Sequence, residues 1–177
     1  RPQIDSALTQ AKITSEFYQW IRITDDEAFA QIKQVAGMLQ FDVTARLSTS
    51  LSNTPMSGAK INVVSGNFVL AQPIGIADGI DYCHSGKVRR IDVDGIKRQL
   101  DTNDIVLLGP IAASITGESF NLTAEEVATK VAIKLKADKM IGFCQNHGLL
   151  NDKGDVIAEL VPNDAERIAS AMHHNCS

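Results

Sequence analysis

Several side chains of this 177-residue sequence are of types used in catalysis, but their spacing fixes no active-site geometry. Cys144 and His147 could form a thiolate and its base, yet a three-residue separation in a loop does not align them, and no third orienting group is evident. Glu125 and Glu126 fall in the first turn of an expected helix, where the helix dipole favours acids whatever their role. The residues alone therefore predict no catalytic site.

Glycine-containing loops could bring backbone amides close to a phosphate or carboxylate. The candidates are Gly66, Gly109, Gly117 and Gly148. No P-loop or dinucleotide fingerprint is present, so ordinary turns are the favoured interpretation. The loops at 65–67, 114–118 and 144–148 follow expected strands and could line one crevice of an α/β sheet.

Two further sets of residues could bind a ligand. Asn121 precedes an expected helix, so its amide could hold an anion at that helix N-terminus or could simply stabilise the loop. His173, His174 and Cys176 lie together at the end of the chain without partner ligands elsewhere, so we expect no metal site. The three cysteines are widely spaced and are expected to be reduced thiols.

The elements that would position these residues alternate between helix and strand. Apolar residues recur at helical spacing from Asp25 to Leu51, and Thr123-Ala124-Glu125-Glu126 resembles a capping box for a helix to about Lys136. Further helices are expected at 93–100, with Asp92 as N-cap, and from Asn163 to Ala171. Strands are expected at 61–64, 68–71, 88–91, 105–108 and 140–143. The strands at 105–108 and 140–143 should be buried, which indicates an α/β fold with a mostly parallel sheet.

Composition excludes several functional classes. The formal charge is −4 and basic residues are scattered except for Lys87, Arg89 and Arg90, so nucleic acid is not an expected partner. No apolar run approaches the roughly 20 residues that span a bilayer, and no signal-peptide pattern opens the chain, so we expect a cytoplasmic protein without a membrane partner. The sequence begins without methionine and both ends look like cuts, so a fragment is expected.

Long stretches of the sequence resemble a known family. They are Arg1–Asp5, Ile21–Asp25, Asn62–Phe68, AQPIGIADGIDYCHSGKVRRID at 71–92, TGESFNLTAEE at 116–126, and 132–144. Together they resemble the bacterial N-acetylglutamate synthases of arginine biosynthesis. The resemblance covers the chain to about Pro162 and weakens in the last fifteen residues.

This resemblance implies a three-layer amino-acid-kinase (carbamate-kinase-like) fold, with 1–177 as an incomplete domain of that kind and the acetyltransferase domain absent. It implies a regulatory, oligomer-building role in a homo-oligomer whose full-length form takes acetyl-CoA as substrate and L-arginine as effector. We expect no cofactor and no acetyl transfer in this chain. The family's arginine pocket would lie largely outside it, so arginine binding by the chain alone is not expected.

Site residues follow from the related acetylglutamate kinases. Arg22 and Asn121 match residues that hold the acetylamino acid there. Glu125 stands where those kinases use an aspartate that organises their catalytic lysines, and Gln145 replaces an aspartate near the nucleotide, so phosphoryl transfer is not expected. An acetylglutamate kinase using ATP remains the alternative. The possible pocket loops contribute Ser65, Gly66, Asn67, Gly117, Glu125 and Gln145.

Overall fold

The computed structural model describes residues 2–48, 58, 61–143, 155–157, 159, 161, 163 and 165. The chain divides into two compact units, Arg1–Met140 and Ile141–Ser177. All of the helices and strands named below belong to the first unit. Most of the expected last helix from Asn163 to Ala171 lies outside the described residues, as do His173, His174 and Cys176.

The chain begins with two helices that flank a short hairpin. They are α1 (Pro2–Gln10), β1 (Glu16–Tyr18), β2 (Ile21–Ile23) and α2 (Asp26–Leu47). Asp25 is the N-cap of α2, because its Oδ1 accepts the Ala28 N–H at 2.8 Å. The long helix predicted from the apolar spacing is confirmed as far as Leu47.

The middle of the chain supplies most of the strands and two more helices. The strands are β3 (Val63–Val64), β4 (Val69–Pro73), β5 (Ile76–Ala77), β6 (Ile80–Asp81), β7 (Gly86–Ile91), β8 (Ile105–Val106), β9 (Ile111–Ala113) and β10 (Ser119–Asn121). The helices are α3 (Val93–Asp101) and α4 (Ala124–Leu135). The predicted cap of α3 is confirmed, since Asp92 Oδ1 accepts the Gly95 N–H at 3.0 Å.

The largest sheet has the strand order β10-β9-β4-β7, and β3 pairs separately with β8. The β4–β9 and β3–β8 pairs are parallel, whereas β4–β7, β9–β10, β1–β2 and β5–β6 are antiparallel. Strands β3 and β4 follow one another in sequence with a bend at Asn67 between them, but they do not pair: β3 pairs with β8, and β4 pairs with β7 and β9. A short connection in sequence therefore does not indicate a hairpin here.

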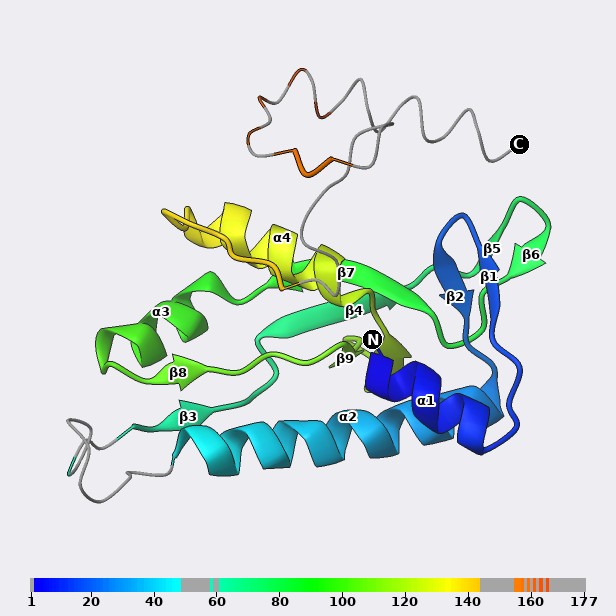
Figure 1. Ribbon diagram of the computed structural model, residues 1–177, viewed down its shortest axis with the longest axis horizontal. Helices are drawn as coiled ribbons and strands as arrows, with labels where there is room; N and C mark the ends of the chain where they lie inside the picture. Colours follow the sequence, from blue (N-terminus) through cyan, green and yellow to red (C-terminus); the bar gives the residue numbers. More distant parts are fainter. Residues whose placement is uncertain are drawn as a thin grey trace. The chain divides into compact units, whose positions relative to one another are not determined.

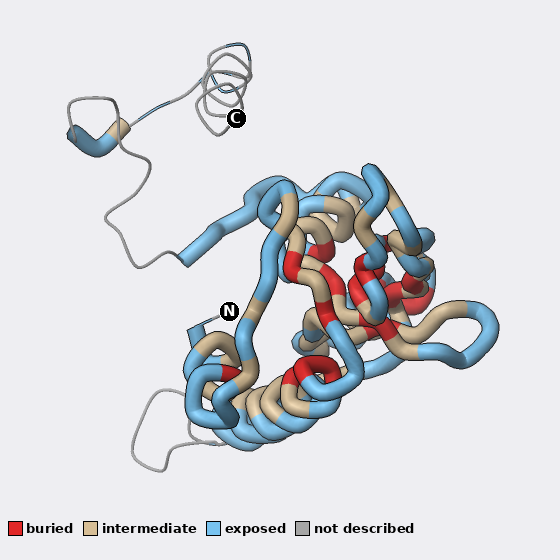
Figure 2. Tube along the Cα trace, turned by 90° about the vertical axis from the view of Figure 1, so that its right-hand side faces the viewer, coloured by how far each residue is buried: buried red, intermediate tan, exposed pale blue. Residues whose placement is uncertain are grey.

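Helices lie on both sides of the strands, with α4 above β7, α3 above β8, and α1 and α2 below β4 (Figure 1). The upper side contains the main apolar core, which includes Ala71, Ile96 and Val127. A smaller cluster joins Leu8 of α1 to Ala28 and Ile32 of α2. Figure 2 shows the buried stretches of the chain in red. This is the layered α/β arrangement expected from the sequence.

Two strand predictions and one capping prediction are wrong. Residues 140–143 form no strand, and Phe143 is 98% exposed, because none of the described strands pairs with this segment. The strand at 105–108 is limited to β8, and Ile105 is 37% exposed because only β3 flanks it among the described strands. Thr123 is the N-cap of α4, but its side chain makes no capping hydrogen bond.

Glu126 has a different role from the one that the capping box predicted. Its Oε1 accepts the Val88 N–H at 3.2 Å and pairs with Lys130 Nζ at 2.6 Å, while Lys130 Nζ donates to the Val88 carbonyl at 3.1 Å. Strand β7 is at the edge of its sheet among the described strands, so these two side chains satisfy backbone groups that no described strand reaches. The pair fixes α4 to β7.

Replacing Glu126 with alanine should lower the free energy of unfolding by about 1–2 kcal/mol, because the partly buried Val88 N–H loses its acceptor. Glu126→Gln is the matched control, since its amide oxygen still accepts that hydrogen bond. Urea unfolding followed by circular dichroism measures both variants. Equal losses in the two variants would show that the charge, not the hydrogen bond to Val88, is what matters.

Candidate functional site

A pocket with a cavity volume of about 80 Å³ opens at the N-terminus of α4. Its wall is largely apolar and is built from Ile4, Phe17, Trp20, Ile21, Pro110 and Leu122. Its polar groups are Arg22, Ser85, Asn121, Thr123 and Glu125. An apolar wall with a few convergent polar groups is the usual form of a small-molecule site.

Arg22 is placed in this pocket by the short hairpin β1–β2. It lies opposite Phe17, in a ladder closed by the two-residue turn Gln19-Trp20, both of which have positive φ. The guanidinium is 8% exposed and lies 4.5 Å from the centre of the Phe17 ring. A buried cation of this kind requires polar partners.

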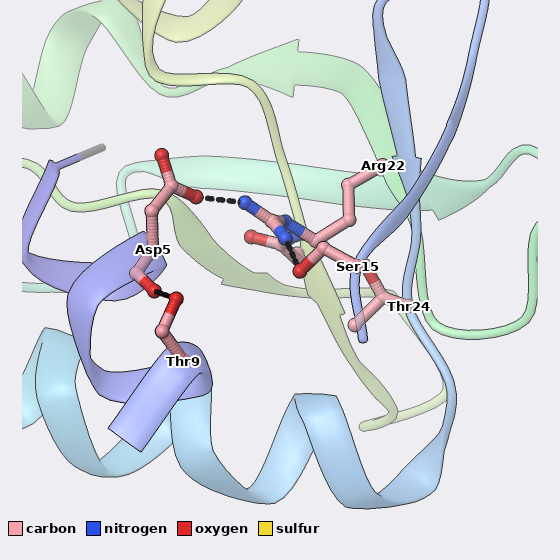
Figure 3. Close-up of polar contacts among 6 residues, drawn as sticks. Asp5, Thr9, Ser15, Arg22 and Thr24 are labelled. Carbon is pink, nitrogen blue, oxygen red and sulfur yellow. Dashed lines mark hydrogen bonds and ion pairs between the residues drawn. The ribbon is translucent and has the colours of Figure 1, made fainter. Parts of the chain in front are cut away.

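The partners of Arg22 come from the start of the chain. Its Nη2 pairs with Asp5 of α1 and its Nη1 donates to Ser15 Oγ, so the guanidinium lies between these two residues (Figure 3). Asp5 is 47% exposed, and these contacts use two of the five N–H donors of Arg22. A guanidinium can bind a carboxylate through two parallel hydrogen bonds.

Asn121 ends β10 on the other side of the pocket. Its backbone N–H donates to the His84 carbonyl at 2.9 Å, and its side-chain Nδ2 donates to Thr24 Oγ1 at 3.1 Å. The first turn of α4 follows directly, and Thr123 and Glu125 line the same pocket. Unpaired amides at a helix N-terminus favour an anion. The arrangement can therefore hold a carboxylate against an apolar wall.

The structure brings together three residues singled out from the sequence: Arg22, Asn121 and Glu125. The loop at 65–67 is not part of this lining, and Ser65 instead lines a separate hollow against α2. Gly117 lies in the turn between β9 and β10, with φ +87°, and is also outside the lining. Gln145 and the rest of the loop at 144–148 lie outside the described residues.

Sequence reasoning missed three residues that support this pocket: Asp5, Thr24 and Ser85. Thr24 follows Arg22 by two positions, so the strand period places both side chains on one face, and that signal was available in the sequence. The contacts of Asp5 and Ser85 join segments 17 and 63 residues apart along the chain, and no local pattern indicates them.

Cys83 and Tyr82 are reactive groups that do not belong to this lining. Desolvation raises the pKa of the Cys83 thiol, and the carboxylates of Asp81, Asp25 and Asp26 raise it further, so the thiol stays protonated and weakly nucleophilic. Burial, with Asp78 and Tyr18, also raises the pKa of Tyr82. In the described part of the chain no three His, Cys, Asp or Glu side chains gather to hold a metal ion. No described helix is long and apolar enough to cross a membrane.

Residues 1–172 match the amino acid kinase family, and the chain belongs to that family. Within it, the similar curated proteins are amino-acid acetyltransferases. The chain is 66% identical over 172 residues to the one from Shewanella oneidensis, with 97% of the chain and 39% of that protein covered. It is 56% identical to the one from Vibrio cholerae, covering all of the chain and 40% of that protein. The chain thus spans about two fifths of the length of the curated relatives that it matches.

Among solved structures, N-acetylglutamate synthase from Neisseria gonorrhoeae, complexed with coenzyme A and L-arginine, superimposes with a TM-score of 0.86 at 30% identity. That match covers 94% of this chain and 39% of the gonococcal protein. The resemblance and the α/β amino-acid-kinase fold expected from the sequence are confirmed.

Proposed function

We propose that this chain forms the kinase-like regulatory part of an N-acetylglutamate synthase. That enzyme acetylates L-glutamate from acetyl-CoA in the first step of arginine biosynthesis. The observation that carries the proposal is the close likeness of nearly the whole chain to amino-acid acetyltransferases. The structural likeness to a synthase complexed with L-arginine supports L-arginine as the effector of the whole protein.

The pocket at the start of α4 is proposed as a binding site for a carboxylate ligand related to glutamate. Arg22 offers the remaining donors of its guanidinium, a geometry that suits a carboxylate. Asn121 also lines the pocket, and the first turn of α4 adds the positive end of a helix dipole. Glu125 carries a negative charge in the same pocket and would favour a ligand with a cationic or N–H group. Ser65, Gly66, Asn67 and Gly117 have no part in this proposed site.

Acetyl transfer is proposed to depend on parts of the protein other than this chain. Arg22 is the only cation among the residues that line the described pocket, and it is already paired with Asp5. Phosphoryl transfer needs several cations or metal ions around the transferred group. The substitutions at Glu125 and Gln145 agree with this, so acetylglutamate kinase activity is the weaker alternative.

Self-association is proposed to use the outer face of α2. Met38 is 68% exposed and Phe41 is 76% exposed, and their three-residue separation places them on one side of the helix. Neighbouring exposed apolar side chains mark contact surfaces more often than isolated ones do. The homo-oligomer expected from the family resemblance would cover them.

The purified 177-residue chain should release no coenzyme A when it is given acetyl-CoA and L-glutamate, and no ADP when it is given ATP and N-acetyl-L-glutamate. A whole synthase that contains these residues serves as the positive control, and its coenzyme A release should respond to L-arginine. Glutamate-dependent release by the chain alone would contradict the regulatory assignment. ADP formation would favour the kinase alternative.

A further inference from the structure

The start of α1 belongs to a pocket that is small for a ligand. Ile4 lines the pocket wall, and the next residue, Asp5, pairs with Arg22 Nη2 (Figure 3). The cavity volume is about 80 Å³, whereas small-molecule sites usually enclose about 300–1,000 Å³. The pocket must therefore widen to admit a ligand, and the first turn of α1 is one of the elements that limit it.

Charge also opposes a ligand carboxylate while Asp5 is in place. The charged residues of the lining are Arg22 and Glu125, and Asp5 adds a second carboxylate against Arg22. One cation and two carboxylates give this group a net charge of −1. Nη1 and Nη2 of Arg22 are both engaged, so a ligand carboxylate held by two parallel hydrogen bonds shares a nitrogen with Asp5 or Ser15. Two carboxylates on one guanidinium repel each other, so a ligand competes with Asp5 for Arg22.

Asp5 also lines a second hollow, of about 610 Å³, which gives its carboxylate another place to lie. The polar residues that line this hollow with it are Thr9, Lys12, Thr14 and Ser15. The Asp5 side chain is 47% exposed, so it regains water easily, and Lys12 supplies a cation in the same hollow. Leu8 is 1% exposed and packs on Ala28 and Ile32, so α1 stays anchored to α2 when its first turn moves. Turning Asp5 away from Arg22 is therefore a local change.

We propose that Asp5 is an internal competitor for Arg22, which it holds while the pocket is empty and releases when a ligand carboxylate enters. This inference rests on the proposed function of the pocket as a carboxylate site and describes how that site is regulated. The empty form has the Asp5–Arg22 pair and the bound form does not. The pair therefore lowers the affinity for a carboxylate by the factor by which it stabilises the empty form. A contact elsewhere that draws α1 away from Arg22 would raise the affinity by up to that factor.

Asp5→Asn tests the competition, because asparagine has nearly the shape of aspartate but no charge. In the full chain it should raise the affinity for N-acetyl-L-glutamate about fivefold and lower the equilibrium constant for folding without this probe about fivefold. The affinity is measured by the fluorescence of Trp20, which lines the pocket, and the folding constant by urea unfolding. At saturating probe, wild type and Asp5→Asn should be equally stable, since the bound form has already given up the pair.

Asp94→Asn is the matched control, since Asp94 is an exposed acid in the first turn of α3, which has nine residues like α1. It removes the same charge from the same part of a helix, yet Asp94 is not part of the pocket lining. Its affinity for the probe should equal that of wild type. In the Arg22→Gln background, Asp5→Asn should bring no gain in affinity, because the two carboxylates no longer share a cation.

The possible results separate the competition from the pocket itself. An affinity of Asp5→Asn equal to that of wild type would overturn the proposal and leave the pocket as a carboxylate site. A lower affinity, with a stability difference that widens as probe is added, would also overturn it and would show that Asp5 orients Arg22 for its ligand. No response of either protein to N-acetyl-L-glutamate would contradict the pocket and the proposal together.

Discussion

Replacing Arg22 with glutamine is expected to weaken N-acetyl-L-glutamate binding about a hundredfold, or about 2.8 kcal/mol. The guanidinium is the one cation in the pocket lining and is 8% exposed, so its hydrogen bonds to a ligand carboxylate are little screened by water. Glutamine keeps a polar end but has neither the charge nor the planar fork. Arg22→Lys should give an intermediate loss, since it keeps the charge alone. Isothermal titration calorimetry measures each affinity.

The same substitution should also lower the free energy of unfolding by about 2 kcal/mol, because Asp5 and Ser15 lose their shared partner. Because the half-exposed Asp5 keeps part of its hydration, the loss in the free energy of unfolding is limited. Arg46 is an exposed arginine in the last turn of α2, so Arg46→Gln is the matched control. It should change neither the affinity for N-acetyl-L-glutamate nor the free energy of unfolding measurably. Unchanged affinity in Arg22→Gln would remove Arg22 from the binding site.

Replacing Gly86 with alanine is expected to lower the free energy of unfolding by about 2–3 kcal/mol. An added Cβ would lie 2.6 Å from Phe120 Cβ and 3.0 Å from the Gln72 carbonyl oxygen, neither of which can move without shifting its backbone. Gly86 opens β7 next to Ser85, where that segment meets β10, so the missing side chain allows the close approach. The pocket should lose affinity together with stability, since Ser85 and Asn121 are separated.

Gly37→Ala in α2 is the matched control for Gly86→Ala. Nothing lies within 4 Å of its added Cβ, and alanine is a better helix former than glycine, so stability should rise by up to about 1 kcal/mol. Thermal unfolding of both variants under the same conditions gives the comparison. An unchanged free energy of unfolding in Gly86→Ala would mean that β7 and β10 can move apart at this point without loss of stability.

The elements that local sequence determines were predicted well. The Asp92 cap, the apolar spacing of α2 and the residues 123–136 around α4 each act within a few positions along the chain, so the sequence shows them directly. The strand at 140–143 was predicted from its apolar run alone. Burial of a strand depends on neighbours that a single segment does not reveal.

The site could be predicted only in part for the same reason. Arg22 and Asn121 were found through family resemblance, and the structure adds that they line one pocket. The loops at 65–67 and 114–118 were expected to line one crevice because each stands at the end of an expected strand, yet β3 and β9 belong to different sheets in the described structure. Pairing partners decide which loops converge, and the bend at Asn67 gave no indication of those partners.

Chemical-shift mapping of the isotope-labelled chain titrated with N-acetyl-L-glutamate and L-glutamate tests the binding site most directly. Saturable shifts should concentrate on the backbone amides of Arg22, Leu122, Ala124 and Glu125 and on the Trp20 indole, all of which belong to the pocket lining. The amides of Gly66 and Gly117 should stay unchanged. Shifts centred on Gly66 and Gly117, or no saturable shifts in the pocket, would contradict the proposed ligand site at the start of α4.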